Sequence, residues 1–123
     1  MLFRSRPVVA LVGDGSAMYT VQALWTAAHY KIPLIWVIFN NTSYRILKQR
    51  LVAMRGIAEQ ADTFVGMELN NPAIDFVGLA KSLGIDAARA TNVKDATDLI
   101  AKGLKDNRPL LIDVAMERNY KPA

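Results

Sequence analysis

The sequence predicts an α/β fold with an open parallel sheet and flanking helices. Short apolar runs of strand length alternate along the chain with segments in which apolar residues recur at helical spacing. Two of these runs, residues 7–12 and 33–39, are apolar at every position, which is typical of parallel strands covered on both faces. The length of 123 residues suits one domain with a single core.

The first part of the chain is expected to form a strand, a helix and a second strand. Ser16 can cap the helix, which we place at residues 17–30. Its predicted inner face consists of Met18, Val21, Leu24, Trp25 and Ala28. We expect Trp36, in the second strand, to pack in the core as well. The three elements make a βαβ unit, for which a right-handed crossover is the strong expectation.

The rest of the chain adds three helices and two strands. In order, we expect a helix over residues 44–54, an irregular connection over 56–72, a helix over 76–83, a strand over 85–90, a helix over 93–104, a strand over 109–115 and a polar tail. Asp75 can cap one helix, Gly84 can end it, and Asn92 with Asp95 resembles a capping box for the next. The helix over 44–54 has an apolar face of Leu47, Leu51 and Met54.

The composition excludes several classes of protein. Hydrophobic residues make up 52% and charged residues 21%, which is typical of a globular domain and not of a disordered segment. There is no cysteine, which excludes disulfides and thiolate chemistry and fits a reducing compartment, so we expect a cytoplasmic protein. No apolar run approaches the roughly 18 residues that span a bilayer, so we expect no membrane segment.

The net charge of +4 raises the question of nucleic acid binding. The basic residues gather in one stretch: Arg45, Lys48, Arg50 and Arg55. No aromatic residues interleave with these charges as they would on a stacking platform. We therefore interpret the cluster as a solvated helix face and expect no nucleic acid partner.

Polar residues follow the first two predicted strands at the point where each strand ends. The segment Gly13-Asp14-Gly15-Ser16 follows the first strand, and Asn40-Asn41 ends the second. Because ligands of open α/β sheets bind beyond the carboxyl ends of the strands, we expect Asp14 and Asn41 to meet at such an edge. A carboxylate and an amide oxygen are ligands that suit Mg²⁺.

The same segment has features that suit a diphosphate. Gly13 and Gly15 let the backbone turn sharply and approach a ligand closely. The helix that begins near Ser16 would direct free N–H groups and its positive dipole end toward phosphate oxygens. On spacing alone, an ordinary strand-to-helix turn remains the alternative. The dinucleotide fingerprint does not fit, because Met18 stands where it needs glycine, and the GK[ST] ending of a P-loop is absent.

The motif resembles that of thiamine-diphosphate-dependent enzymes. GDG at residues 13–15 is followed by NN at residues 40–41, with 24 residues between them. Residues 23–28 and 41–44 are similar to the diphosphate-binding domain of the benzoylformate decarboxylase and acetolactate synthase family. The similarity runs from about residue 7 to residue 114. It implies a thiamine-diphosphate-binding fold, with thiamine diphosphate and Mg²⁺ as cofactors.

The resemblance also implies roles for individual residues. Asp14 and Asn41 would bind Mg²⁺ through their side chains, and Ser43 through its backbone carbonyl. The full set of expected cofactor-binding residues is Gly13, Asp14, Gly15, Ser16, Asn41, Ser43, Tyr44 and Ile46. Ile46 and Leu47 fall where the family lines the pocket around the thiazolium, with ordinary core packing as the alternative. Arg50 replaces an apolar pocket residue of some relatives, which puts an aromatic 2-oxo acid substrate in doubt.

The glutamate with which the family activates its cofactor has no counterpart in this sequence. That glutamate lies on a separate pyrimidine-binding domain, usually of a neighbouring subunit. Glu59, Glu68 and Glu117 match no such motif, and we interpret each as a solvated charge. His29, the one histidine, is expected at the surface at the far end of the first helix. We therefore expect no catalytic residue in this chain.

The leading hypothesis is the Mg²⁺-dependent, thiamine-diphosphate-binding part of a 2-oxo acid decarboxylase or carboligase. The resemblance implies that residues 1–123 are a diphosphate-anchoring domain truncated at its N-terminal side, inactive alone and part of a homo-oligomer. One alternative is a non-catalytic assembly module whose exposed apolar surface favours self-association. Another is a different α/β phosphate binder, such as a flavodoxin-like module.

Overall fold

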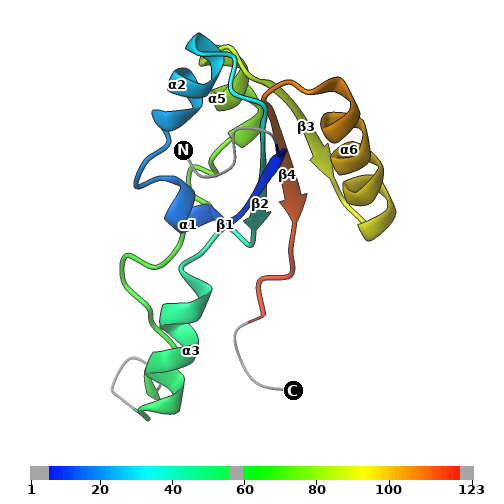
Figure 1. Ribbon diagram of the computed structural model, residues 1–123. Coiled ribbons are helices and arrows are strands. Elements are labelled where there is room, and N and C mark those ends of the chain that lie inside the picture. Colours follow the sequence, from blue (N-terminus) through cyan, green and yellow to red (C-terminus); the bar gives the residue numbers. More distant parts are fainter. Residues whose placement is uncertain (1–5, 56–59, 120–123) are drawn as a thin grey trace.

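The computed structural model describes residues 6–55 and 60–119, and its four strands form one parallel sheet. The strands are β1 (Val8–Gly13), β2 (Leu34–Asn40), β3 (Asp86–Ala90) and β4 (Leu110–Ala115). They lie in the order β1-β2-β4-β3, and every neighbouring pair is parallel (Figure 1). The predicted open parallel sheet with flanking helices is therefore confirmed.

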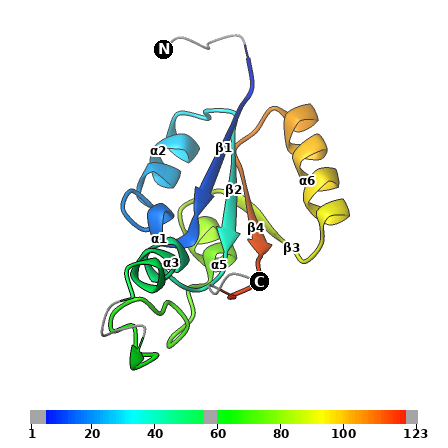
Figure 2. The ribbon, with the colours of Figure 1, turned by 90° about the horizontal axis from the view of Figure 1, so that it is seen from below.

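Helices cover the two faces of this sheet unequally. On one face lie α1 (Asp14–Ala17), α2 (Ala23–His29) and α5 (Phe76–Ser82), and on the other lies α6 (Val93–Asp106) (Figure 2). An apolar cluster lies on each face of the sheet. Because neighbouring residues of a strand point to opposite faces, β2 contributes side chains to both clusters. Its Ile38 packs with the α2 and α5 side, and its Val37 packs with the α6 side.

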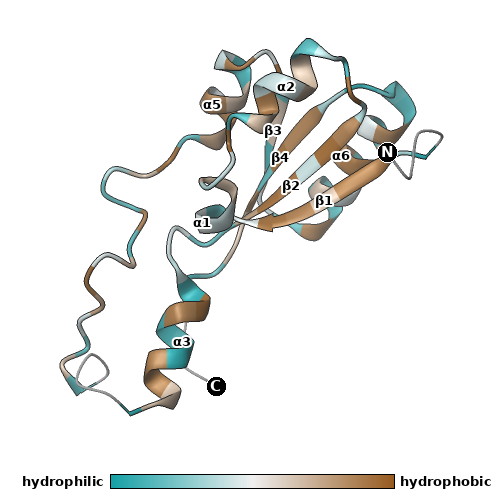
Figure 3. Cartoon of the chain, turned by 60° about the vertical axis from the view of Figure 1, so that its left-hand side comes forward, coloured by the Kyte–Doolittle hydropathy of each residue, from teal (hydrophilic) through white to brown (hydrophobic). Residues whose placement is uncertain are grey.

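Strand β1 is covered on one face only. Leu11 is 65% exposed on the face that α6 covers elsewhere, because α6 packs over β4, β3 and β2 and leaves β1 open. An apolar groove remains on this face, and its lining includes Leu11, Phe39, Val93 and Met116. The apolar colouring of β1 is visible in Figure 3. The prediction that residues 7–12 are buried on both faces is therefore wrong.

The helix predicted at residues 17–30 is divided into two. Helix α1 begins directly at the end of β1, and residues 18–22 separate it from α2. Ser16 lies inside α1 and caps nothing, because the chain turns helical two residues before it. The core side of α2 uses Leu24 and Ala27, so Trp25 is exposed against the prediction, whereas Trp36 packs against the core as expected.

Helix α3 (Arg45–Ala53) projects from the carboxyl edge of the sheet and does not lie on either face (Figures 1 and 3). Its predicted inner residues Leu47 and Met54 are exposed, and its buried side chain is Lys48. The apolar-face prediction fails because it assumed that every helix packs on the sheet.

The predicted helix caps in the second half are confirmed. Oδ1 of Asp75 accepts a hydrogen bond from the backbone N–H of Gly78 at 2.9 Å, and Oδ1 of Asn92 accepts one from Asp95 N–H at 2.9 Å. Gly84 follows α5 with a φ of +82°, the left-handed conformation that favours glycine. These local signals are reliable because each involves residues only three positions apart.

Candidate functional site

Asp14 is the first residue after β1, and its side chain is buried at the carboxyl edge of the sheet. Its Oδ1 accepts a hydrogen bond from Gly15 N–H at 2.9 Å, and its Oδ2 accepts one from Ser43 N–H at 3.2 Å. Burial raises the pKa of this carboxyl above its ordinary value, and the surrounding backbone N–H groups offset that rise in part. The structure thus holds a poorly solvated carboxylate in a fixed orientation.

Asn41 lies directly after β2, and its side chain meets the backbone N–H of Ser43 as well. Its Oδ1 accepts a hydrogen bond from Ser43 N–H at 3.1 Å, so the Asp14 and Asn41 oxygens converge on one amide. The parallel register of β1 and β2 explains this meeting, because Gly13 pairs with Phe39 at the ends of the two strands. The predicted proximity of Asp14 and Asn41 is present in the structure.

The turn between these residues carries backbone strain at Thr42. Its φ of +54° lies in the left-handed region, which costs a residue with a side chain roughly 1–2 kcal/mol. Two hydrogen bonds hold it: Thr42 N–H donates to Oδ1 of Asn40 at 3.1 Å, and Leu69 N–H donates to the Thr42 carbonyl at 2.8 Å. Asn40 thus shapes the turn that carries Asn41, the residue predicted to bind the metal.

Ser43 lies between the two predicted ligand side chains. Its backbone N–H is the donor shared by Asp14 and Asn41. Its hydroxyl is buried and has no hydrogen-bond partner within residues 6–55 and 60–119. A buried polar atom without a partner is costly, and it is a reason to look for a ligand at this turn.

The two glycines of the motif have different roles. A Cβ on Gly15 would come within 2.7 Å of Cδ1 of Tyr44, so the tyrosine ring packs directly on this backbone. A Cβ on Gly13 would meet nothing within 4 Å, which leaves open space beside the end of β1. The chain turns directly from β1 into α1 here, as expected, but neither glycine has a positive φ. Gly15 is needed for close packing instead.

The other predicted pocket residues are exposed on the two helices that flank the turn. Ser16 is exposed on α1, and Ile46, Leu47 and Arg50 are exposed on α3. The core-packing alternative for Ile46 and Leu47 is therefore wrong, and their place in a cofactor pocket stays a prediction.

The predictions of solvent exposure for the three glutamates and the histidine can be compared with the structure. Glu117 is exposed, as expected, and Glu59 lies outside the described residues. His29 is exposed on α2, as expected, and its ring stacks on Trp25 with 4.9 Å between the centroids. Glu68 is exposed, as expected, but it also pairs with Lys48 and Arg118, which the prediction did not include.

Sequence reasoning missed this charged cluster beside the turn. The Lys48 ammonium is buried and forms an ion pair with Oε1 of Glu68, and Nη2 of Arg118 donates to Oε2 of Glu68 at 2.7 Å. The hydrogen bond from Lys48 is the main reason why the pKa of Glu68 lies below its usual value. Lys48 and Glu68 are 20 positions apart with an irregular segment between them, so no local pattern pairs them.

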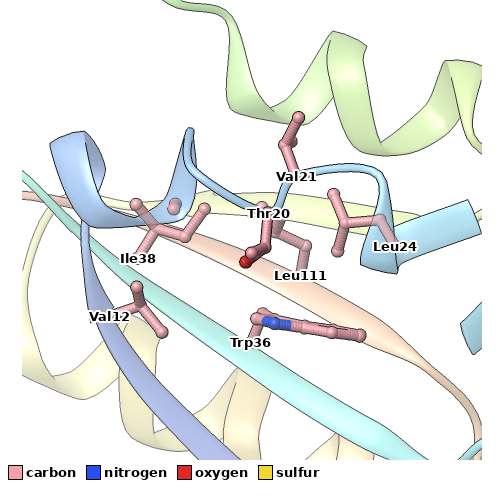
Figure 4. A pocket seen from close by; sticks show the side chains of 8 residues that line it. Val12, Thr20, Val21, Leu24, Trp36, Ile38 and Leu111 are labelled. Carbon is pink, nitrogen blue, oxygen red and sulfur yellow. The ribbon is translucent and has the colours of Figure 1, made fainter.

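A small pocket on the sheet is separate from this cluster. It lies under the connection between α1 and α2, and Val12, Trp36, Ile38 and Leu111 from the strands contribute to its lining (Figure 4). Its volume of about 50 Å³ is far below the roughly 300 Å³ of a small ligand pocket. Thiamine diphosphate does not fit there.

The donor atoms at the turn fit a hard cation. Within the described ranges, no three His, Cys, Asp or Glu side chains form a metal-binding group. A metal at Asp14 would therefore also need amide or carbonyl oxygens, and Mg²⁺ accepts such ligands together with phosphate and water oxygens. No helix in the described part of the chain is long and apolar enough to cross a membrane.

Comparison with known protein families assigns the chain. A family model described as "Thiamine pyrophosphate enzyme, C-terminal TPP binding domain" matches residues 1–114. The chain belongs to this family. The resemblance predicted from the GDG and NN motifs is confirmed.

Individual relatives agree with this assignment. A candidate acetolactate synthase large subunit of Mycobacterium tuberculosis is 33% identical over 112 residues, which are 90% of this chain and 22% of the relative. Benzoylformate decarboxylase of Pseudomonas aeruginosa is 33% identical over 109 residues, 89% of this chain and 19% of the relative. The chain thus spans about a fifth of the length of these relatives.

Solved structures share the fold. The thiamine diphosphate-dependent 4-hydroxybenzoylformate decarboxylase of Rhodococcus jostii RHA1 superposes with a TM-score of 0.83 at 33% sequence identity. The match covers 95% of this chain and 21% of that one.

Proposed function

We propose that this chain binds the diphosphate end of thiamine diphosphate through Mg²⁺, as part of a 2-oxo acid decarboxylase or carboligase. One observation carries the proposal: the side-chain oxygens of Asp14 and Asn41 converge on the backbone N–H of Ser43. Family membership supplies the cofactor class, and this convergence supplies a place for the metal.

In this proposal Mg²⁺ takes the side-chain oxygens of Asp14 and Asn41 and the backbone carbonyl of Ser43. These are one charged and two neutral oxygens, and Mg²⁺ usually leaves its other positions to phosphate and water. The open space beside Gly13 provides room for diphosphate oxygens, and Gly15, Ser16 and Tyr44 line the same edge.

In this proposal the cofactor and the protein contribute different parts of the reaction. Thiamine diphosphate supplies an electron sink for 2-oxo acid chemistry, and the protein supplies position and electrostatics. This chain would anchor and orient the diphosphate end. Activation would require a glutamate of a pyrimidine-binding domain, from the same or a neighbouring subunit of a cytoplasmic homo-oligomer. The chain alone would then be inactive.

Calorimetric titration of the protein with thiamine diphosphate, with and without Mg²⁺, tests the proposal. We expect saturable binding that requires Mg²⁺ and is abolished by a chelator. Unphosphorylated thiamine is the matched control ligand, and we expect no binding because it lacks the diphosphate. Equal binding of both compounds, or binding that ignores Mg²⁺, would contradict the proposal.

A second candidate function is that of an assembly module without a cofactor. The exposed apolar groove that Leu11 of β1 and Phe39 of β2 help to line favours it. The same titration separates the two candidates, because an assembly module would self-associate and show no heat of Mg²⁺-dependent binding. The match to a TPP-binding family argues against the flavodoxin-like alternative.

A further inference from the structure

The turn that carries Asn41 and Ser43 is fastened to a segment beyond α3. Tyr44 N–H donates to the Met67 carbonyl at 2.9 Å, and Leu69 N–H donates to the Thr42 carbonyl at 2.8 Å. Between these bonds, Ser43 and Glu68 form an isolated antiparallel bridge. The strained turn is thus held from outside the sheet by three residues of an otherwise irregular connection.

The Lys48–Glu68 ion pair connects residues 67–69 to α3. Lys48 follows Tyr44 by one helical turn, and its whole residue is only 2% exposed. Its ammonium lies 5.8 Å from the centroid of the Phe64 ring, so it is enclosed by the same connection that carries Glu68. Arg118, after β4, holds the second oxygen of the Glu68 carboxylate.

Asn70 adds a further tie between this connection and the chain after β4. With its amide oxygen facing Arg118, it accepts from Nη2 and Nη1 at 3.0 and 3.2 Å. Three segments distant in sequence therefore meet next to the turn: α3, the connection before α5, and the chain after β4.

We propose that the Lys48–Glu68 ion pair is a positioning device for the metal-binding turn at residues 41–43. The inference rests on the proposed function, because it concerns the same Mg²⁺ site. The reason is mechanical: Thr42 is held in an unfavourable conformation, and the bond that holds it comes from Leu69, the residue directly after Glu68. Outer partners that orient metal ligands commonly contribute about 10- to 100-fold to metal affinity.

Lys48 and Glu68 differ in burial, and this difference predicts how strongly each substitution should disturb the turn. The Lys48 side chain is 3% exposed and that of Glu68 is 45% exposed. Glu68→Gln removes a negative charge that faces the buried Lys48 ammonium, whereas Lys48→Met leaves a half-exposed carboxylate beside Arg118. Removing a partner of a buried charge costs more than removing a partner of a charge near water, and replacing both partners is milder. We therefore expect Glu68→Gln to be the most disruptive, Lys48→Met less so, and the double variant milder than Glu68→Gln.

The first readout is amide hydrogen exchange of the metal-free protein, which does not depend on the cofactor. In Glu68→Gln, we expect the amides of Tyr44 and Leu69 to exchange about 10-fold faster or more, while the amides of β2 and β4 keep their rates. Lys94→Met is the matched control, because it breaks the exposed Lys94–Asp98 ion pair on α6. We expect no change at Tyr44 or Leu69 in that control.

The second readout is the calorimetric affinity for Mg²⁺ in the presence of thiamine diphosphate. We expect Glu68→Gln to weaken it about 10-fold or more, and Lys48→Arg to retain most of it because the charge remains. Unchanged exchange at Tyr44 and Leu69, an equal rise in exchange throughout the sheet, or local loosening with unchanged Mg²⁺ affinity would each overturn the inference. Absence of Mg²⁺-dependent binding in the wild-type protein would instead overturn the proposed function.

Discussion

The backbone N–H of Ser43 donates a hydrogen bond to Oδ2 of Asp14, 3.2 Å away, and this bond joins the loop after β2 to the end of β1. Asn41 shares the same donor at 3.1 Å. An N–H group can satisfy only a small part of the acceptor capacity of two side-chain oxygens, because a carboxylate alone offers about four lone-pair sites. The remaining lone pairs are the ones that we assign to Mg²⁺.

Removing the Asp14 carboxylate should abolish Mg²⁺-dependent cofactor binding. We expect Asp14→Ala to weaken the affinity for Mg²⁺ and thiamine diphosphate by more than about 100-fold, since even outer partners of metal ligands contribute up to that much. Asp14→Asn, which keeps the shape, should behave similarly and guards against a folding defect. Asp98→Ala, on the exposed face of α6, is the control. Unchanged calorimetric binding in both Asp14 variants would remove Asp14 from the site.

The raised pKa of Asp14 predicts that stability and metal binding both depend on pH. The folded, metal-free protein favours the protonated carboxyl, so its contribution to stability is complete below the ordinary pKa of 3.8 and is lost as pH rises through the higher folded pKa. Metal binding needs the carboxylate and has the opposite trend: affinity should fall as pH drops through that same pKa. Titrations at several pH values would measure this.

The Asp14→Asn variant is the control for the stability part of this prediction, measured by chemical denaturation of the metal-free protein at several pH values. It removes the carboxyl group, so any remaining pH dependence of the free energy of unfolding belongs to other residues. Identical pH profiles of stability in the two proteins would show that the Asp14 carboxyl contributes nothing to that dependence.

The two motif glycines should respond differently to alanine. Gly15→Ala places a methyl group against the Tyr44 ring, and we expect a loss of about 1–3 kcal/mol in the free energy of unfolding. Gly13→Ala enters open space with an extended backbone, φ −73°, so stability should stay within about 0.5 kcal/mol. Chemical denaturation measures both. Equal losses in the two variants would mean that Tyr44 does not pack on Gly15.

The exposed face of β1 should drive association of the isolated chain. Leu11→Thr keeps a residue that favours strands and removes most of the exposed apolar surface at this position. We expect a smaller average mass in light scattering at high protein concentration, with thermal stability close to that of the wild type. Val65→Thr, on the connection after α3, is the control, because Val65 is exposed even more than Leu11. If both variants reduced association equally, the exposed face of β1 would not be its specific cause.

Local signals in the sequence predicted much of this fold correctly. The apolar runs at residues 7–12 and 33–39 became β1 and β2, and Asp75 and Asn92 cap their helices through bonds to residues three positions away. The proximity of Asp14 and Asn41 also followed, because parallel pairing of the two strands leaves the segments after them at the same edge.

The failures share one cause, which is packing between distant segments. Helical spacing assigned Leu47 to an inner face, yet α3 leaves the sheet and buries Lys48 instead. The position of Glu68 in an irregular connection predicted only a solvated charge, yet the connection returns to the turn and pairs this exposed residue with that lysine. Neither outcome has a signature within one helix or one strand.

The sequence by itself therefore determined the strands, their capped helices and the edge where Asp14 and Asn41 meet, because these follow from residue periods and short-range hydrogen bonds. Only the tertiary structure decided that Asp14 and Asn41 share the Ser43 N–H and that Tyr44 packs on Gly15. It also decided that Lys48 and Glu68 form an ion pair beside the turn. The physical reason is that a buried charge finds its partner through the path of the whole chain and not through spacing along it.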